Sequence, residues 1–200
     1  MSLKCEQSVC LDNEVTNSIG VDKFHEVARG SLYTFEYDFD EELNHLYIYY
    51  ATQKDIDNLI FPLNLKKISI KGDHVDTLII PDGIENVFIG RVGLKFLYLP
   101  DSVKSLYCDN NLLKNLELPR NIQFVNAKEN YIENISFREG DPLELEVLKL
   151  NNNSRLTKLD FIPPSCLEVI KIKKCSNLRY VNPQLISIAN KYEEQPQYIL

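Results

Sequence analysis

An apolar pattern of the form L-x-x-L-x-L recurs along the chain in seven rows, and it constrains the fold more than any other feature. Subtracting the residue numbers of successive second apolar positions gives steps of 22, 19, 19, 19, 23 and 22 residues. A repeating unit this short cannot bury its apolar face alone, so it must stack on its neighbours as a solenoid. The rows begin at Leu43, Leu65, Ile84, Val103, Ile122, Leu145 and Leu167. The second and third apolar columns are Leu46, Ile68, Val87, Leu106, Val125, Leu148 and Ile170, then Ile48, Ile70, Ile89, Cys108, Ala127, Leu150 and Ile172.

Each row needs a sharp turn after its short strand, and the residue three places past the third column suits that purpose. An Asn side chain there can donate to and accept from buried backbone groups, and so form a ladder along the stack. Asn or a small Cys occupies this position in the last four rows. The three earlier rows do not fit, so we expect an imperfect ladder near the N-terminal end. In chain order the position holds Ala51, Asp73, Val92, Asn111, Asn130, Asn153 and Cys175.

The second half of three units ends in an L-x-L-P type of segment, at 78–81, 97–100 and 116–119. Proline disfavours helix at the residue before it, so these segments are expected to be extended. A unit of 19 residues also leaves little room for a helix on the return path. The sequence therefore predicts a β-rich solenoid with a parallel concave sheet, an extended convex side and little helix.

The segments PDSVKSLYCDNNLLKNLEL (100–118) and PRNIQFVNAKENYIENISF (119–137) resemble the leucine-rich-repeat superfamily. Their short period and Leu-Pro junctions are most similar to the class found in effectors that pathogenic bacteria inject into host cells, and to giant-virus and amoebal repeats. The resemblance covers about residues 42–182. It implies a right-handed superhelical horseshoe, and action in a host cell cytosol.

The ends of the chain depart from the repeat and are expected to cap the stack. Residues 1–41 form the predicted N-terminal cap, with a short helix over 21–30 and a strand over 32–39 that could pair with the first repeat. Residues 42–182 form the repeats. Residues 183–200 form a C-terminal cap and tail, either as one last partial repeat or as a closing element.

Charge and hydropathy exclude several kinds of partner. The net charge is −7, and residues 1–60 carry 12 acidic and 4 basic side chains, so the acidity belongs to the N-terminal end. No strongly basic domain is present, and we expect no nucleic-acid partner. The N-terminus lacks the apolar core of a secretory signal, and no apolar run is long enough to span a bilayer. A cytoplasmic location, or delivery to a host cytosol without a signal peptide, and no membrane partner are therefore expected.

The sequence offers no chemistry for catalysis. The three histidines lie in separate segments without metal-ligand spacing, and no phosphate-binding loop or nucleophile elbow occurs. Cys108 lies in an inward column, where a thiol is inert. We therefore expect no catalytic residue, no cofactor and no metal. Cys108 and Cys175 are expected to be buried free thiols and Cys5 to be accessible.

The residues between the apolar positions should face the concave surface, since side chains alternate along a strand. Aromatic side chains occupy this surface on the earlier strands and lysines on the later ones, which favours a protein partner as ligand. The candidate binding residues are Tyr47, Tyr49, Phe88, Tyr107, Phe124, Lys128, Lys149, Lys171 and Lys173. Gly90 would leave room beside Phe88. Three alternatives stay open: aromatics chosen only for strand propensity, a structural scaffold or oligomerisation module, and an enzyme with an unrecognised site.

Overall fold

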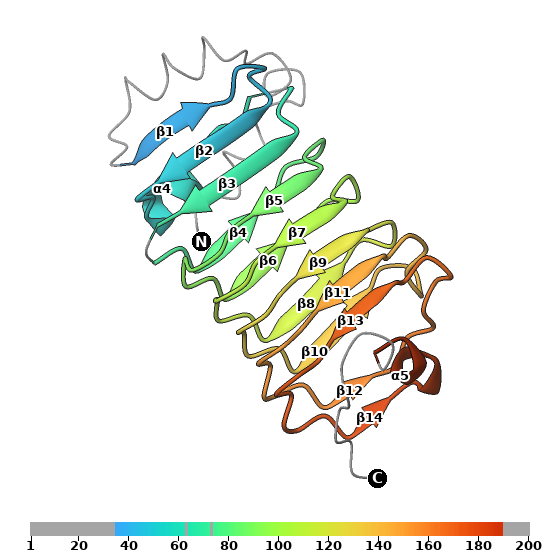
Figure 1. Ribbon diagram of the computed structural model, residues 1–200. Helices are drawn as coiled ribbons and strands as arrows, with labels where there is room; N and C mark the ends of the chain where they lie inside the picture. Colours follow the sequence, from blue (N-terminus) through green and yellow to red (C-terminus); the bar gives the residue numbers. More distant parts are fainter. Residues whose placement is uncertain (1–34, 63, 73, 190–200) are drawn as a thin grey trace.

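The computed structural model describes residues 35–62, 64–72 and 74–189, and these residues form a solenoid of stacked parallel strands. One eight-stranded sheet, called the long sheet below, runs the length of the stack (Figure 1). Its strands, in spatial order, are β1 (Glu36–Phe39), β2 (His45–Tyr49), β3 (Lys67–Lys71), β5 (Asn86–Phe88), β7 (Ser105–Tyr107), β9 (Phe124–Asn126), β11 (Val147–Lys149) and β13 (Val169–Lys171).

The repeat alignment sets the register of the long sheet. Parallel neighbours pair residue for residue within the same column, as Leu106 does with Val125 and Leu148 with Ile170. The exception is β1, which pairs antiparallel with β2 as a hairpin. This confirms the expected strand for its residues 36–39. The helix expected over 21–30 lies outside the described residues.

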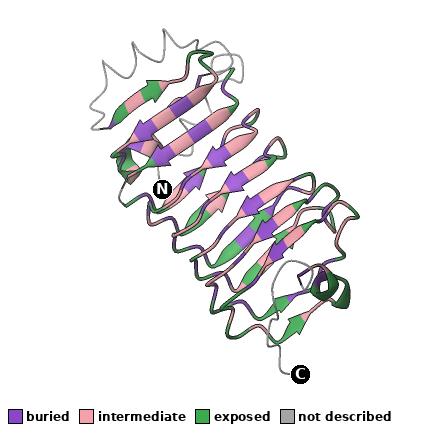
Figure 2. Ribbon diagram, viewed as in Figure 1, coloured by how far each residue is buried: buried purple, intermediate pink, exposed green. Residues whose placement is uncertain are grey.

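The second and third apolar columns form the core, as the sequence predicts. Every residue in them is at most 4% exposed. Figure 2 shows the resulting alternation of buried and half-buried residues along the strands of the long sheet. The first column is also buried, except at its first member, where the prediction was wrong. Leu43 is 48% exposed, because it lies in the turn of the β1–β2 hairpin with a φ of 56°.

The return side of the solenoid is extended, as the Leu-Pro segments predict. It forms three separate two-stranded parallel sheets, which pair β4 with β6, β8 with β10, and β12 with β14. The bounds are β4 (Thr77–Ile79), β6 (Phe96–Tyr98), β8 (Asn115–Leu118), β10 (Asn134–Phe137), β12 (Lys158–Leu159) and β14 (Tyr180–Val181).

Two short helices occur in the described part of the chain. The first, α4 (Gln53–Asp57), is capped by reciprocal hydrogen bonds between Thr52 and Asp55. The second, α5 (Pro183–Ala189), buries Leu185 and Ala189 and packs against β13. Residues 183–189, in the region predicted as a C-terminal cap, are thus helical and lie against the last strand of the long sheet.

A ladder of buried asparagines closes the turns of the later coils. The Nδ2 of Asn111 donates to the carbonyl of Ile89 in the preceding coil, at 2.6 Å, and to that of Cys108 in its own coil, at 3.0 Å. Its Oδ1 accepts from the backbone N–H groups of Leu94, at 3.0 Å, and Val92, at 3.2 Å. One side chain therefore satisfies four buried backbone groups across two coils.

Asn130 and Asn153 repeat this arrangement, each joining its coil to the one before. The ladder ends at Cys175, whose thiol donates to the carbonyl of Leu150 with an Sγ–O distance of 3.3 Å. Cys175 is half-buried rather than buried as predicted, because it lies in the last coil of the stack. At the N-terminal end the equivalent positions hold buried Ala51 and Val92, so the ladder is imperfect there, as expected.

Candidate interaction surface on the long sheet

The outward face of the long sheet carries the candidate residues that the alternation predicts. Eight of the nine are half-buried among their neighbours, and Lys173 is exposed just past the end of β13. The structure arranges them into two adjacent groups. Aromatic rings lie over β2 to β9, and ammonium groups lie over β9 to β13. Each group is held by strands whose inward residues are buried in the core, so the packing fixes which side chains face outward.

Five rings form one continuous stack, called the aromatic stack below. Successive ring centroids from Phe88 to Tyr107 and from Tyr107 to Phe124 are 4.8 and 4.6 Å apart, with planes inclined by 18° and 24°. On the other side, His45 is stacked 3.9 Å from Tyr47 and 5.8 Å from Phe88. The stack therefore spans five neighbouring strands, from β2 to β9, of which all but β3 contribute a ring.

His45 makes the stack continuous, although it is not among the candidate binding residues predicted from the sequence. The strand β3 contributes Ser69, not a ring, at the position between Tyr47 and Phe88. The imidazole of His45 fills that gap and lies 2.8 Å from the hydroxyl of Ser69. Burial lowers the pKa of His45, and the positive charge of Lys67 lowers it further. The negative charge of Asp40 raises this pKa and so counters part of the effect. The neutral ring therefore predominates around neutral pH.

The stacking determines which part of each ring is free for a ligand. In a face-to-face stack the negative ring faces contact one another, and the positive edges remain. A nucleobase, or a sugar that stacks through its C–H groups, needs an exposed ring face, which the interior of this stack does not offer. A side chain or backbone carbonyl of a protein can instead contact the ring edges.

Tyr49 stands apart from the aromatic stack. Its ring lies under the ammonium group of Lys71, 5.8 Å from ring centroid to Nζ. The sequence predicted that Gly90 leaves room beside Phe88, but Asp109 of the next coil occupies part of that space. A Cβ built at Gly90 would lie 3.4 Å from the backbone oxygen of Asp109.

Beyond the aromatic stack, the four predicted lysines gather at the C-terminal part of the long sheet. We call Lys128, Lys149, Lys171 and Lys173 the lysine cluster. The Nζ of Lys149 lies 4.9 Å from the centroid of Phe124, so a cation–π contact joins the two groups. Burial, together with the positive charges of Lys128 and Lys171, lowers the pKa of Lys149. Within the described residues, none of the four lysines has a carboxylate at ion-pair distance.

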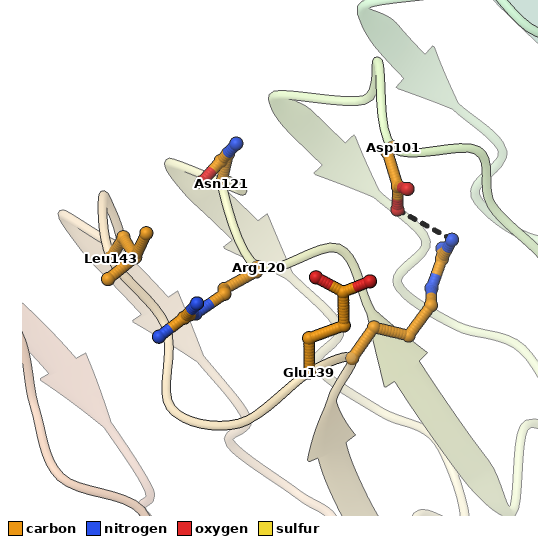
Figure 3. A pocket seen from close by; sticks show the side chains of 6 residues that line it. Asp101, Arg120, Asn121, Glu139 and Leu143 are labelled. Carbon is orange, nitrogen blue, oxygen red and sulfur yellow. Dashed lines mark hydrogen bonds and ion pairs between the residues drawn. The ribbon is translucent and has the colours of Figure 1, made fainter.

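Other chemistry is sparse in the described part of the chain. Burial raises the pKa of the Cys108 thiol, with a further contribution from Asp109, and so disfavours the reactive thiolate. No cluster of three or more potential metal ligands occurs among the described residues. A shallow hollow of about 200 Å³ is lined mainly by charged and polar side chains (Figure 3). Two of them, Arg138 and Asp101, are ion-paired at 2.7 Å. Small-molecule sites are larger and mostly apolar, typically about 300–1,000 Å³.

Comparison with known proteins returns no matching family model, no matching curated protein and no matching solved structure. Across the described residues, neither helix has the length and apolar character needed to cross a membrane.

Proposed function

We propose that this chain is a protein-interaction module that binds its partner on the outward face of the long sheet. One observation carries the proposal. A pre-formed aromatic stack lies on the same face as a lysine cluster that has no ion-pair partner among the described residues. Aromatic groups are the usual anchors of protein interfaces, and charges mainly steer association. The partner would place apolar side chains along the stack and an acidic segment over the lysines.

The repeat pattern supports a closer assignment to the leucine-rich-repeat type. Short units, inward Leu, Ile and Val columns, and the asparagine ladder are all features of that resemblance. On that basis we propose an effector-like or viral module acting in a cytosol, with no catalytic activity, cofactor or metal of its own.

The test is capture of partners by the full chain from a cell lysate, followed by surface plasmon resonance with each purified candidate. The paired substitution Phe88→Ala and Tyr107→Ala removes the middle of the aromatic stack. We expect the lost anchoring contacts to reduce the binding free energy by about 2 kcal/mol. This corresponds to roughly 30-fold weaker binding, mostly through faster dissociation.

A matched control exists on the return side. Phe96 and Tyr98 are each 57% exposed on β6, so the paired change Phe96→Ala and Tyr98→Ala removes the same two residue types from the opposite face. We expect the control to bind as the unaltered chain does. Equal weakening by both pairs, or full binding by a folded Phe88→Ala and Tyr107→Ala variant, would refute the proposal.

A further inference from the structure

A second charged group lies at the other end of the long sheet from the lysine cluster. The β1–β2 hairpin carries five carboxylates within seven residues, of which four are exposed and one is half-buried. We call them the acidic hairpin: Glu36, Asp38, Asp40, Glu41 and Glu42. Their hydrogen bonds are local, as when Asp40 accepts from the backbone of Asn44 and His45. Within the described residues none of them has a cation at ion-pair distance.

These two groups of opposite charge cannot neutralise each other within one molecule. The hairpin strand β1 and the strand β13 are the first and last of the eight strands (Figure 1). With about 4.8 Å between neighbouring strands, the outermost strands β1 and β13 are about 34 Å apart. The nearest strands that adjoin the two groups, β2 and β9, are four spacings or about 19 Å apart. The packed core and the intervening strands between them keep the two groups apart. Within the described residues, neither group therefore has an ion-pair partner, and a second molecule can supply one.

From this complementarity we propose that the acidic hairpin of one copy docks on the lysine cluster of a second copy, in a head-to-tail assembly. The inference rests on the proposed function in one respect, since it takes the lysine cluster to be a binding surface, and it identifies a partner for that surface. The two halves of such a contact come from different parts of the chain. The assembly is therefore heterologous, and it continues into a ring or an open row of copies.

The physics of the contact determines its expected strength. Exposed ion pairs are each weak, and salt screens them over a Debye length of about 30 Å at 0.01 M and about 3 Å at 1 M. The repulsion that Lys128 and Lys171 exert on Lys149 is relieved when carboxylates arrive. We therefore expect a reversible, concentration-dependent assembly at low salt that dissociates at high salt.

Acidic side chains on an end strand have another possible effect, since charge on a sheet edge discourages pairing with other chains. That effect and the proposed docking predict opposite behaviour. Edge protection keeps the chain monomeric at every salt concentration, whereas docking produces larger species at low salt.

The experiment is sedimentation velocity of the full chain over a range of concentrations, at low and high salt. Two variants with neutralised charges are compared. The first, in the acidic hairpin, combines Glu36→Gln, Glu41→Gln and Glu42→Gln. The second, in the lysine cluster, combines Lys149→Gln and Lys171→Gln. Each variant alone should sediment as a monomer at low salt, because one half of every contact is missing. An equimolar mixture should form a species of two copies and no larger, because each variant keeps the half that the other lacks.

A control variant, Lys114→Gln with Arg179→Gln, removes two exposed positive charges from the return side and should assemble as the unaltered chain does. Folding of each variant is checked by circular dichroism. A monomeric unaltered chain at low salt would overturn the proposal, as would a mixture that stays monomeric or a control that also dissociates. Partner binding in the preceding experiment would stand in those cases, so failure of this inference is distinguishable from failure of the proposed function.

Discussion

The earlier and later coils of the solenoid close the same turn with different chemistry. In the earlier coils the turn position holds the apolar side chains of Ala51 and Val92, both buried. In the later coils it holds Asn111, Asn130 and Asn153, whose amides bond to the backbone of two coils at once. Yet strands on both sides of this change pair in one continuous sheet. The polar ladder is therefore an addition to the turn and not a requirement for it.

The backbone explains why both kinds of side chain fit. The residue just before the turn position has a left-handed φ in the earlier coils, at Tyr50 and Arg91, as well as in the later ones, at Asn110, Glu129 and Asn152. A shared backbone conformation thus makes the bend. The asparagines form hydrogen bonds with buried backbone groups that the bend leaves without partners. Three predictions test whether the backbone makes the bend and the asparagines only satisfy these groups.

The largest effect is expected from Asn130→Leu. This change leaves the N–H of Leu113 without its acceptor. It also removes one of the two side-chain donors to each of the carbonyls of Cys108 and Ala127, which keep Asn111 and Asn153 respectively. A buried N–H without a partner costs about 1–3 kcal/mol and each further hydrogen bond lost costs about 1 kcal/mol, so we expect a loss of about 3–5 kcal/mol. Urea unfolding followed by circular dichroism measures it. A loss below that of the matched Val92→Leu variant would mean that water replaces the amide.

A smaller effect is expected from the reverse change, Val92→Asn, in the coil before the ladder. The new amide would lie near the carbonyl of Ile89 in its own coil, as Asn111 lies near that of Cys108. Because the polar group finds partners, we expect the cost to stay near 1 kcal/mol. The control Val87→Asn places the same amide in the middle of β5, where the strand offers no such partners, and should cost several-fold more. Equal losses in the two variants would show that the turn position is not specialised.

The smallest effect, and a stabilising one, is expected from Glu129→Gly. Glu129 has a φ of 54°, a conformation that costs a side-chain-bearing residue about 1 kcal/mol or more and glycine very little. Allowing for the greater entropy that glycine loses on folding, we expect a gain of about 0.5 kcal/mol. Thermal melting detects this gain. The control Glu117→Gly lies exposed in β8 and should lower stability instead.

Much of the fold could be predicted because it follows from periodicity. The inward columns, the parallel register and the extended return segments each depend on residue spacing alone, and the structure confirms them. Leu43 shows the limit of this reasoning, since it matches the pattern yet lies in a hairpin turn. Its row is the first, and no earlier repeat imposes a strand there.

The sequence predicted which residues lie on the candidate surface, but not how their side chains contact one another. Alternation placed Phe88 and Tyr107 on one face, whereas the continuity of the aromatic stack depends on the side-chain torsions of His45. No sequence period encodes those torsions. The helix α4 was also missed, although Thr52 and Asp55 have the spacing of a capping box and lie in a 22-residue step with room for a turn of helix.

The two sides of the solenoid differ in continuity, and this has a mechanical consequence. The long sheet is joined by hydrogen bonds from end to end, whereas the return side is divided into three separate pairs of strands. Stretching the long sheet would break ladder bonds in every coil it crosses. Opening the return side between β6 and β8, or between β10 and β12, breaks no strand ladder. The molecule should therefore bend most easily at those two levels, with the long sheet acting as the inextensible side and the return side widening or narrowing. Such bending would let the outward face adjust its curvature to a partner while each strand keeps its register.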